Sequence, residues 1–179
     1  MGCDTIGNFD IHAIDAALWI TGQRPTSCVG AGRICRPNPQ ADSHDLFFLT
    51  YQCANGLLWS HQSYHIPDHG RGLVCNVNGE LASGQISYWG TSFLRGGPKN
   101  YGGGEVVNLY EQGAVRNIAA FHRLILEGHY DNPTVRQAVD GVLITILGRE
   151  AGDRNVRLTM DEILKENKKL EVDLSGLKV

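Results

Sequence analysis

The chain has 179 residues, a formal net charge of −3, 42% hydrophobic residues and 20% charged residues, which is typical of a single globular domain over residues 1–179. With 16 lysines and arginines and no basic stripe beyond Lys165, Lys168 and Lys169, the sequence argues against a nucleic-acid surface. No apolar run approaches the roughly 18 residues that a membrane span requires, so we expect no membrane-spanning segment.

The cysteines are odd in number and none is paired as C-x-x-C, which speaks against both a disulfide framework and a zinc ribbon. They are Cys3, Cys28, Cys35, Cys53 and Cys75. We expect free thiols and a cytoplasmic protein, with an exported parent protein left open.

The first strong element is a helix from about Asp10 to Thr21, which Gly22 ends. Its apolar face holds Ile11, Ile14 and Leu18. If the first turn reaches back to Asn8, helical spacing stacks a second row of side chains along the other face. That row is Asn8, His12, Asp15 and Trp19.

Strands are expected next, at Thr26–Ile34, Leu46–Cys53 and Leu57–His65, where β-branched, aromatic and leucine side chains gather. Ala54-Asn55-Gly56 is a turn signal that permits positive φ, so the last two strands should form an antiparallel hairpin. Leu46–Leu58 carries apolar residues at both parities, which predicts that both sheet faces need cover. Helices would cover one face and a second subunit or the missing domain the other, so we expect a homo-oligomer formed through the sheet.

A second turn signal, Asn78-Gly79, predicts a further hairpin between Leu73–Val77 and Leu81–Tyr88. The glycine-rich stretch Gly90–Gly104 is interpreted as a long surface loop, with a flap over a site as the alternative.

The final third is helical. Apolar residues recur at helical spacing up to Gly128, and Asn132 caps a helix over about Pro133–Ala151. Thr159 with Glu162 forms a capping box for a short last helix, and the segment 172–174 is a candidate edge strand. The pattern predicts an α+β fold with an open, mostly antiparallel sheet and helices on one face.

A dinucleotide site is missing from the sequence. The nearest glycine pair, Gly30-Ala31-Gly32, lies in an expected strand and is not followed by a third glycine and a helix. There is also no P-loop, no G-x-S-x-G and no H-E-x-x-H, so kinase, hydrolase and zincin functions have no support.

The segment GCDTIGNFDIHAIDAALWITG, Gly2 to Gly22, resembles the start of the carboxy-terminal domain in the glucose-fructose oxidoreductase, inositol dehydrogenase and MocA family, where H-x-x-D precedes an aromatic residue. The closing helices resemble those of sugar-active members of this family. The residues that carry this second similarity are Arg116-Asn117-Ile118, Phe121, Gly128, Asn132-Pro133, the run from Leu147 to Ala151, and Thr159 with Glu162, Ile163 and Leu164.

The resemblance implies an NAD(P)-dependent oxidoreductase in which His12 exchanges a proton with a substrate hydroxyl. An unperturbed imidazole, with a pKa near 6.5, suits that exchange in both directions; packing as a half-buried histidine is the alternative. The family commonly has an aspartate where this chain has Asn8, which can hold a hydroxyl but is not a carboxylate. Asp15, one turn on, is expected to orient the His12 ring or to cap packing. The family's dinucleotide-binding domain and its catalytic lysine are absent, so we expect no activity and no cofactor in the isolated chain.

A second set of candidates is spaced by four residues: His61, His65 and His69, with Asp68. Pro67 and the strand context oppose the helix that a metal site with this spacing needs, so no metal is expected. His61 and His65 share one face of a strand and are expected to bind substrate hydroxyls. Trp59 and Tyr64 suit the same pocket, with sheet packing as the alternative. The remaining histidines, expected at the surface, are His44, His122 and His129.

The leading hypothesis is therefore the substrate-binding half of an oxidoreductase for a small polyhydroxylated substrate, a sugar, cyclitol or related polyol. NAD or NADP would be bound mainly by the missing domain. The alternatives are a non-catalytic carbohydrate-binding or oligomerisation module, and a metal-dependent lyase or hydrolase that uses the histidine cluster.

Overall fold

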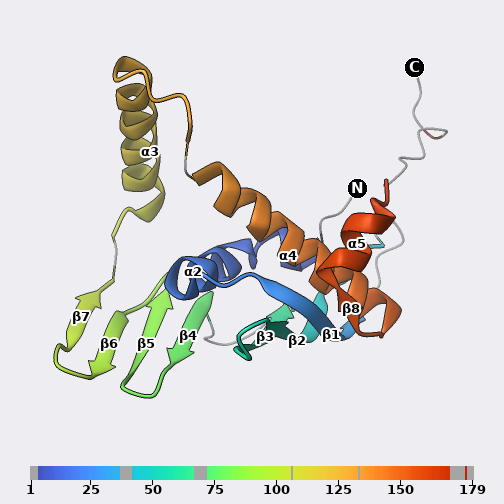
Figure 1. The fold of residues 1–179 in the computed structure, drawn as a ribbon. Coiled ribbons are helices and arrows are strands. Elements are labelled where there is room, and N and C mark those ends of the chain that lie inside the picture. Colours follow the sequence, from blue (N-terminus) through green and yellow to red (C-terminus); the bar gives the residue numbers. More distant parts are fainter. Residues whose placement is uncertain are drawn as a thin grey trace. The chain divides into compact units, whose positions relative to one another are not determined.

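The computed structural model describes residues 4–36, 42–66, 72–105, 107–132, 134–169 and 176. The helices in these ranges are α1 (Asp4–Asn8), α2 (Ile11–Thr21), α3 (Leu109–Leu126), α4 (Thr134–Arg154) and α5 (Met160–Glu166). The strands are β1 (Pro25–Arg33), β2 (Leu46–Cys53), β3 (Leu58–Tyr64), β4 (Val74–Asn78), β5 (Ala82–Ser87), β6 (Ser92–Gly96), β7 (Tyr101–Gly104) and β8 (Leu158–Thr159) (Figure 1).

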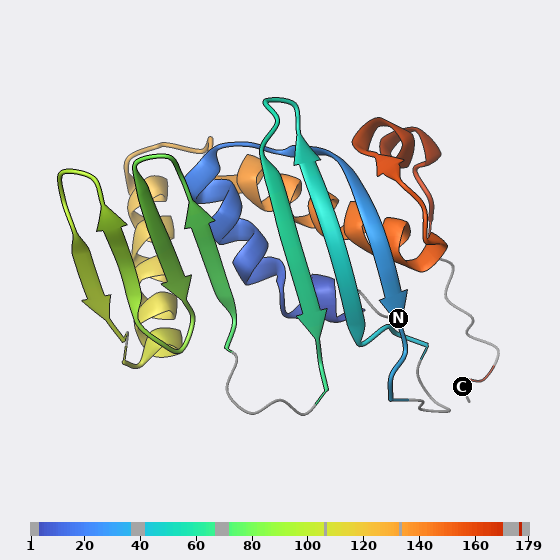
Figure 2. The ribbon, with the colours of Figure 1, turned by 90° about the horizontal axis from the view of Figure 1, so that it is seen from below.

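The strands form two antiparallel four-stranded sheets, β3-β2-β1-β8 and β4-β5-β6-β7 (Figure 2). They belong to two compact units. The first unit comprises residues 1–11, 22–67 and 140–179, and the second comprises residues 12–21 and 68–139. The predicted α+β class with open antiparallel strands is confirmed, with the strands shared between two sheets.

The core of the first unit lies on one face of its sheet. Strict alternation along β2 buries Phe47, Leu49, Tyr51 and Cys53. The residues between them point to the other face, where Phe48 is 50% exposed. Since side chains alternate along a strand, this pattern assigns one face to the helices and leaves the other open. Figure 2, seen from below, shows α4 behind β1 and β2, with α5 beyond the β1 edge next to β8.

The helix α4 approaches this sheet through glycines. A Cβ atom added at Gly148 would overlap the hydroxyl of Tyr51, and one at Gly152 would lie 2.8 Å from the ring of Phe47. The Tyr51 hydroxyl donates a hydrogen bond of 3.2 Å to the carbonyl of Ile144, also in α4. The buried tyrosine therefore fits only because α4 has no side chain at position 148.

Gly148→Ala tests this packing. The added methyl group has no room, so we expect a loss of roughly 1–3 kcal/mol in the free energy of unfolding, measured by urea denaturation. The matched control is Gly113→Ala in α3, where a Cβ meets nothing within 4 Å; there alanine should raise stability by up to about 1 kcal/mol through helix propensity. Equal effects at both positions would contradict the close approach of α4.

A second feature of α4 is a buried carboxylate held by cations. Glu150 is 5% exposed and accepts hydrogen bonds from Arg149 at 3.0 Å and from Arg154 at 2.6 and 3.1 Å. Arg154 also binds Glu166 of α5 at 2.7 and 2.8 Å. Burial alone would raise the pKa of Glu150, but the bonds from Arg154 and Arg149 outweigh it and lower that pKa below its ordinary value of 4.5. The network fastens α5 to α4.

Glu150→Gln should therefore destabilise the fold in a pH-dependent way. We expect a loss of roughly 1–3 kcal/mol at pH 7, since the arginines lose a buried partner. Because the folded pKa is lowered, the wild-type advantage is present above pH 4.5 and disappears as pH falls through the folded value. Urea denaturation of both proteins between pH 7 and pH 3 measures this; a difference that stays constant over the range would contradict it.

The predicted hairpins are confirmed. In the first, Gly56 has φ +87°, the Leu57 N–H donates to Asn55 Oδ1, and β2 pairs with β3 from Leu46↔Tyr64 to Gln52↔Leu58. In the second, Asn78-Gly79 joins β4 to β5. The helix stops are confirmed as well, because Gly22 and Gly128 have positive φ, as is the capping box of Thr159 and Glu162.

The interpretation of Gly90–Gly104 as a loop is wrong. This stretch forms β6 and β7, and β6 pairs with β5 through Gln85↔Phe93 and its neighbours. Gly96 and Gly97, with φ +87° and +71°, make the turn between the strands. Glycine is depleted in strands. The edge strand β7 is mostly glycine, so its sequence carries almost none of the side chains that would predict a strand.

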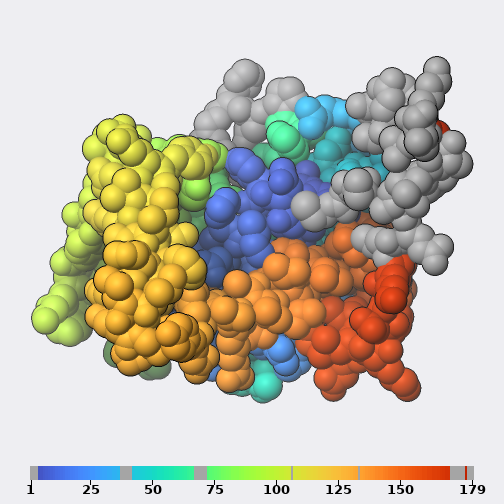
Figure 3. Space-filling model, turned by 90° about the horizontal axis from the view of Figure 1, so that it is seen from above, coloured from blue at the N-terminus to red at the C-terminus, as the bar shows by residue number. Residues whose placement is uncertain are grey.

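The structure differs from the sequence prediction at α3 and at β8. The apolar face of α3 does not form a core, since α3 has no buried residue and Ile118 is 68% exposed; α3, yellow in Figure 3, lies open at the surface. The strand β8 was not predicted and pairs with β1 through Ser27↔Thr159. Pro133 and the candidate strand at 172–174 lie outside the described residues.

Candidate functional site

His12 lies on α2 in the second unit, and its side chain is exposed. Its ring packs against that of Tyr88, with 4.9 Å between ring centroids and 33° between ring planes. In the described part of the chain this ring contact is the interaction found for the imidazole.

Asp15 does not orient the His12 ring. Its carboxylate instead accepts a hydrogen bond of 2.7 Å from the side-chain amide of Gln137, on α4 in the same unit. Asp15 therefore joins α2 to the start of α4. Of the two roles expected for this residue, the structure favours the packing role.

The predicted row from Asn8 to Trp19 is broken. Asn8 is the last residue of α1, and α2 begins at Ile11. The N–H groups of Phe9 and Asp10 both donate to the carbonyl of Thr5, at 2.9 and 3.3 Å, and this turn ends α1. Asn8 is exposed, so its amide is accessible, but it is not on the helix that carries His12.

His61 lies in a buried polar cluster of the first unit. Its Nε2 is 3.4 Å from Oδ2 of Asp10, and the two side chains are 12% and 9% exposed. Within the described residues, Trp59 Nε1 and Ser63 Oγ are further buried polar atoms without a hydrogen-bond partner. Trp59, His61 and Ser63 pair with Tyr51, Leu49 and Phe47 of β2, so they share its buried face. Trp59 thus belongs to the sheet interior and not to an open pocket.

His65 follows the end of β3 and is exposed. Its ring stacks on that of Phe9, with centroids 6.2 Å apart and 9° between planes. His61 and His65 therefore occupy different environments, one inside and one at the surface. Asp68 and His69 lie outside the described residues.

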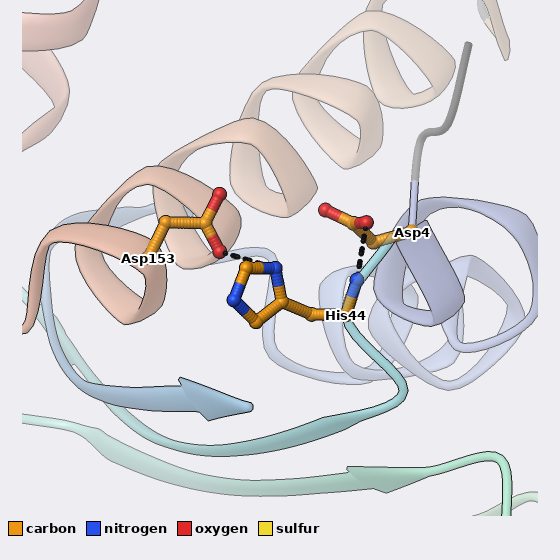
Figure 4. A group of neighbouring side chains, drawn as sticks. All are labelled: Asp4, His44 and Asp153. Carbon is orange, nitrogen blue, oxygen red and sulfur yellow. Dashed lines mark hydrogen bonds and ion pairs between the residues drawn. The ribbon is translucent and has the colours of Figure 1, made fainter. Parts of the chain in front are cut away.

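The sequence suggested that His44 is a free surface residue, but the structure places it in contact with two acidic residues. Its Nδ1 is 3.1 Å from Oδ1 of Asp153, and its backbone N–H donates to Oδ1 of Asp4 at 2.8 Å (Figure 4). One ligand atom from each residue lies within 4.8 Å of the others, a spacing that a metal ion can bridge. Burial is the largest cause that raises the pKa of Asp4 and of Asp153. Asp4, His44 and Asp153 thus connect α1, the segment before β2, and α4. His44 contacts both acidic residues within the chain. His122 and His129 are exposed, as expected.

The glycine pair of the sequence does not form a nucleotide site. Gly30 and Gly32 lie within β1, where a Cβ at Gly30 would overlap the carbonyl oxygen of Phe48 in β2 and one at Gly32 would lie 2.8 Å from the ring of Phe47. They serve close packing in the sheet. A dinucleotide needs glycines in a turn that leads into a helix, so these residues do not fit such a cofactor.

A cavity of about 600 Å³ lies on the β6–β7 hairpin of the second unit, next to Phe93, Arg95 and Tyr101. Arg95 lies over the ring of Phe93, 4.6 Å from its centroid. This hairpin cavity offers a cation and aromatic surface, and the residues that line it include no histidine, aspartate or glutamate.

No family model and no curated protein matches the sequence. The fold, however, matches many solved structures. Levoglucosan dehydrogenase in complex with NADH has a TM-score of 0.71 at 14% identity, covering 87% of this chain and 50% of that one. Scyllo-inositol dehydrogenase from Lactobacillus casei, with bound NAD(H) and scyllo-inositol, has a TM-score of 0.68 at 16% identity. The match covers 90% of this chain and 49% of that one. Aldose-aldose oxidoreductase from Caulobacter crescentus, complexed with glycerol, has a TM-score of 0.68 at 13% identity. The match covers 87% of this chain and 47% of that one.

The chain thus spans about half the length of the solved structures that it matches. At these identities the likeness concerns the fold. Among the described residues, no helix is both long and apolar enough to cross a membrane. The resemblance found in the sequence is confirmed at this level: the chain has the fold of the carboxy-terminal domain of oxidoreductases of the inositol dehydrogenase and aldose oxidoreductase type.

Proposed function

We propose that this chain is the substrate-binding half of an NAD(P)-dependent oxidoreductase that acts on a sugar, a cyclitol or a related polyol. The observation that carries the proposal is His12: an exposed imidazole on the helix that bears the H-x-x-D motif, with no bond that occupies its nitrogens in the described part of the chain. The fold supports it, since solved structures with this fold include dehydrogenases of levoglucosan and scyllo-inositol.

His12 performs the proton transfer of the reaction. The neutral imidazole accepts the proton of a substrate hydroxyl while the carbon that bears this hydroxyl is oxidised, and the imidazolium returns a proton in the reverse direction. The hydride acceptor is NAD or NADP, which supplies redox chemistry that no side chain of this chain can supply. No residue set in the described chain fits a dinucleotide, so the cofactor is held by a separate domain, and this chain alone neither binds it nor turns over substrate.

Polar side chains of the first unit are the candidates for holding substrate hydroxyls. Asn8 is exposed and offers an amide that donates to or accepts from a hydroxyl. His65 is an exposed imidazole beside Phe9, and His61 supports the same region from inside through Asp10. We assign Asn8 and His65 to substrate binding, His61 to the support of that region, and proton transfer to His12.

The partners follow from the surface and the chemistry. The ligand is a small polyhydroxylated molecule. The open face of the first unit's sheet exposes Val29 at 45% and Phe48 at 50%, which favours a homo-oligomer formed through this face. The free thiols of Cys28, Cys35, Cys53 and Cys75 suit the cytoplasm.

The test is His12→Ala in the protein that joins this chain to a dinucleotide-binding domain. We expect kcat to fall by roughly 10²- to 10⁴-fold, the usual effect of losing a positioned acid or base, with cofactor affinity nearly unchanged. Asn8→Ala should mainly raise KM. Reduction of NAD(P) followed at 340 nm, with each polyol of a panel, measures both.

The matched control is His122→Ala, an exposed histidine on α3 that should leave kcat and KM unchanged. If His12→Ala leaves turnover intact and only lowers the melting temperature, His12 is a packing residue. The chain would then act as a non-catalytic carbohydrate-binding or oligomerisation module.

A further inference from the structure

Three side chains that could bind a metal ion meet in the first unit, although they lie far apart in the sequence. Asp4 begins α1, His44 precedes β2, and Asp153 lies near the end of α4. Figure 4 shows the two aspartates on opposite sides of the His44 ring. We call Asp4, His44 and Asp153 the His44 cluster. It combines two carboxylates with an imidazole and so offers both oxygen and nitrogen ligands.

The spacing of the His44 cluster suits a single ion. One ligand atom from each residue lies within 4.8 Å of the other two, and His44 Nδ1 is 3.1 Å from Asp153 Oδ1. Bonds of about 2.1 Å to a tetrahedral ion hold the ligand atoms about 3.4 Å apart. The three ligand atoms therefore have to close by at most about 1.4 Å, a shift within reach of side-chain rotation.

The chain orients the imidazole before an ion arrives. The His44 N–H donates to Oδ1 of Asp4 at 2.8 Å, and a carboxylate has a second oxygen that can bind an ion. The Thr5 hydroxyl donates to the carbonyl of His44 at 3.4 Å. The His44 ring packs against the buried ring of Phe47, with 5.7 Å between centroids. Supporting contacts of this kind orient the ligands of metal sites.

Electrostatics favour a cation at the His44 cluster. Burial is the largest cause that raises the pKa of Asp4 and of Asp153, and the charges of Asp4 and Glu150 raise that of Asp153 further. The charges of His44 and Arg149 act in the opposite direction, but the Arg149 guanidinium donates to Glu150 at 3.0 Å. A bound cation offsets the repulsion between two neighbouring carboxylates. The side chain of Asp153 is 32% exposed, so an ion can reach the cluster from solvent.

We propose that the His44 cluster binds one divalent transition-metal ion of the Zn²⁺ type, through His44 Nδ1 and one oxygen each of Asp4 and Asp153. The imidazole selects such an ion over Mg²⁺ and Ca²⁺, which prefer oxygen ligands. Because Nδ1 bonds the ion, the neutral ring carries its proton on Nε2. The ion connects α1, the segment before β2, and α4, and so stabilises the first unit. The site is independent of the proposed function, since it uses neither the polyol nor the dinucleotide.

Calorimetric titration of the full chain with ZnCl₂, after removal of metals with EDTA, tests the proposal. We expect a Zn²⁺ site whose affinity falls at least about 100-fold in Asp153→Asn and in His44→Ala, because even a supporting contact is worth about 10- to 100-fold. MgCl₂ should bind far more weakly. His129→Ala, which removes an exposed histidine, is the matched control and should keep the affinity of the wild type.

Free thiols also bind Zn²⁺, so NMR of the imidazole nitrogens assigns the site. Zn²⁺ should shift the Nδ1 resonance of His44 and leave those of His122 and His129 in place.

Melting temperature gives a second readout, because an ion that binds only the folded state stabilises it. Zn²⁺ should raise the melting temperature of the wild type and of His129→Ala, but not that of Asp153→Asn. Asp153→Asn keeps the shape of the side chain, so it tests the site even if His44→Ala does not fold; circular dichroism verifies the fold of each variant. An unshifted His44 resonance, an unchanged affinity in folded Asp153→Asn, or Mg²⁺ bound as tightly as Zn²⁺ would overturn the proposal. The cluster would then be an ion pair of His44 with Asp153.

Discussion

The close approach of α4 to β2 is the constraint on which the first unit depends. Gly148 leaves room for Tyr51, whose hydroxyl donates to the carbonyl of Ile144. The same tyrosine ring lies 6.1 Å from Trp59 and 6.3 Å from His61. Tyr51 therefore connects the helix layer to the buried face of β3. A side chain at position 148 would shift that layer and disturb this whole face.

The same packing reaches the start of the helix that bears His12. His61 lies beside Asp10, and Asp10 belongs to the turn between α1 and α2. This turn is also tied to Thr5 through the bonds that end α1. The contact between Asp10 and His61 therefore lies inside the first unit, next to the point at which α2 begins, and neither Oδ2 nor Nε2 has a hydrogen-bond partner among the described residues. Sites built on helices and strands are held more precisely than sites on loops, and His12 lies on the helix α2.

Short-range features could be predicted from the sequence, and contacts between distant residues could not. Asn55-Gly56 predicts a turn and Gly22 predicts a helix end, because glycine adopts the positive φ that both positions require. The edge strand β7 escaped prediction because Tyr101–Gly104 forms a ladder with almost no side chains. His44 meets Asp153, and His12 meets Tyr88, only because the fold brings distant segments together. Sequence patterns carry the period of an element but not its tertiary neighbours.

The central claim is that this chain presents a polyol to a hydride acceptor held by another domain. The most direct measurement follows deuterium from a cyclitol labelled at its carbinol carbons into the nicotinamide ring, in the protein that joins this chain to a dinucleotide-binding domain. We predict that the label appears in the reduced nicotinamide when both domains are present, and that this chain alone transfers none. Substrate turnover without label in the nicotinamide, or label transfer by this chain alone, would contradict the claim.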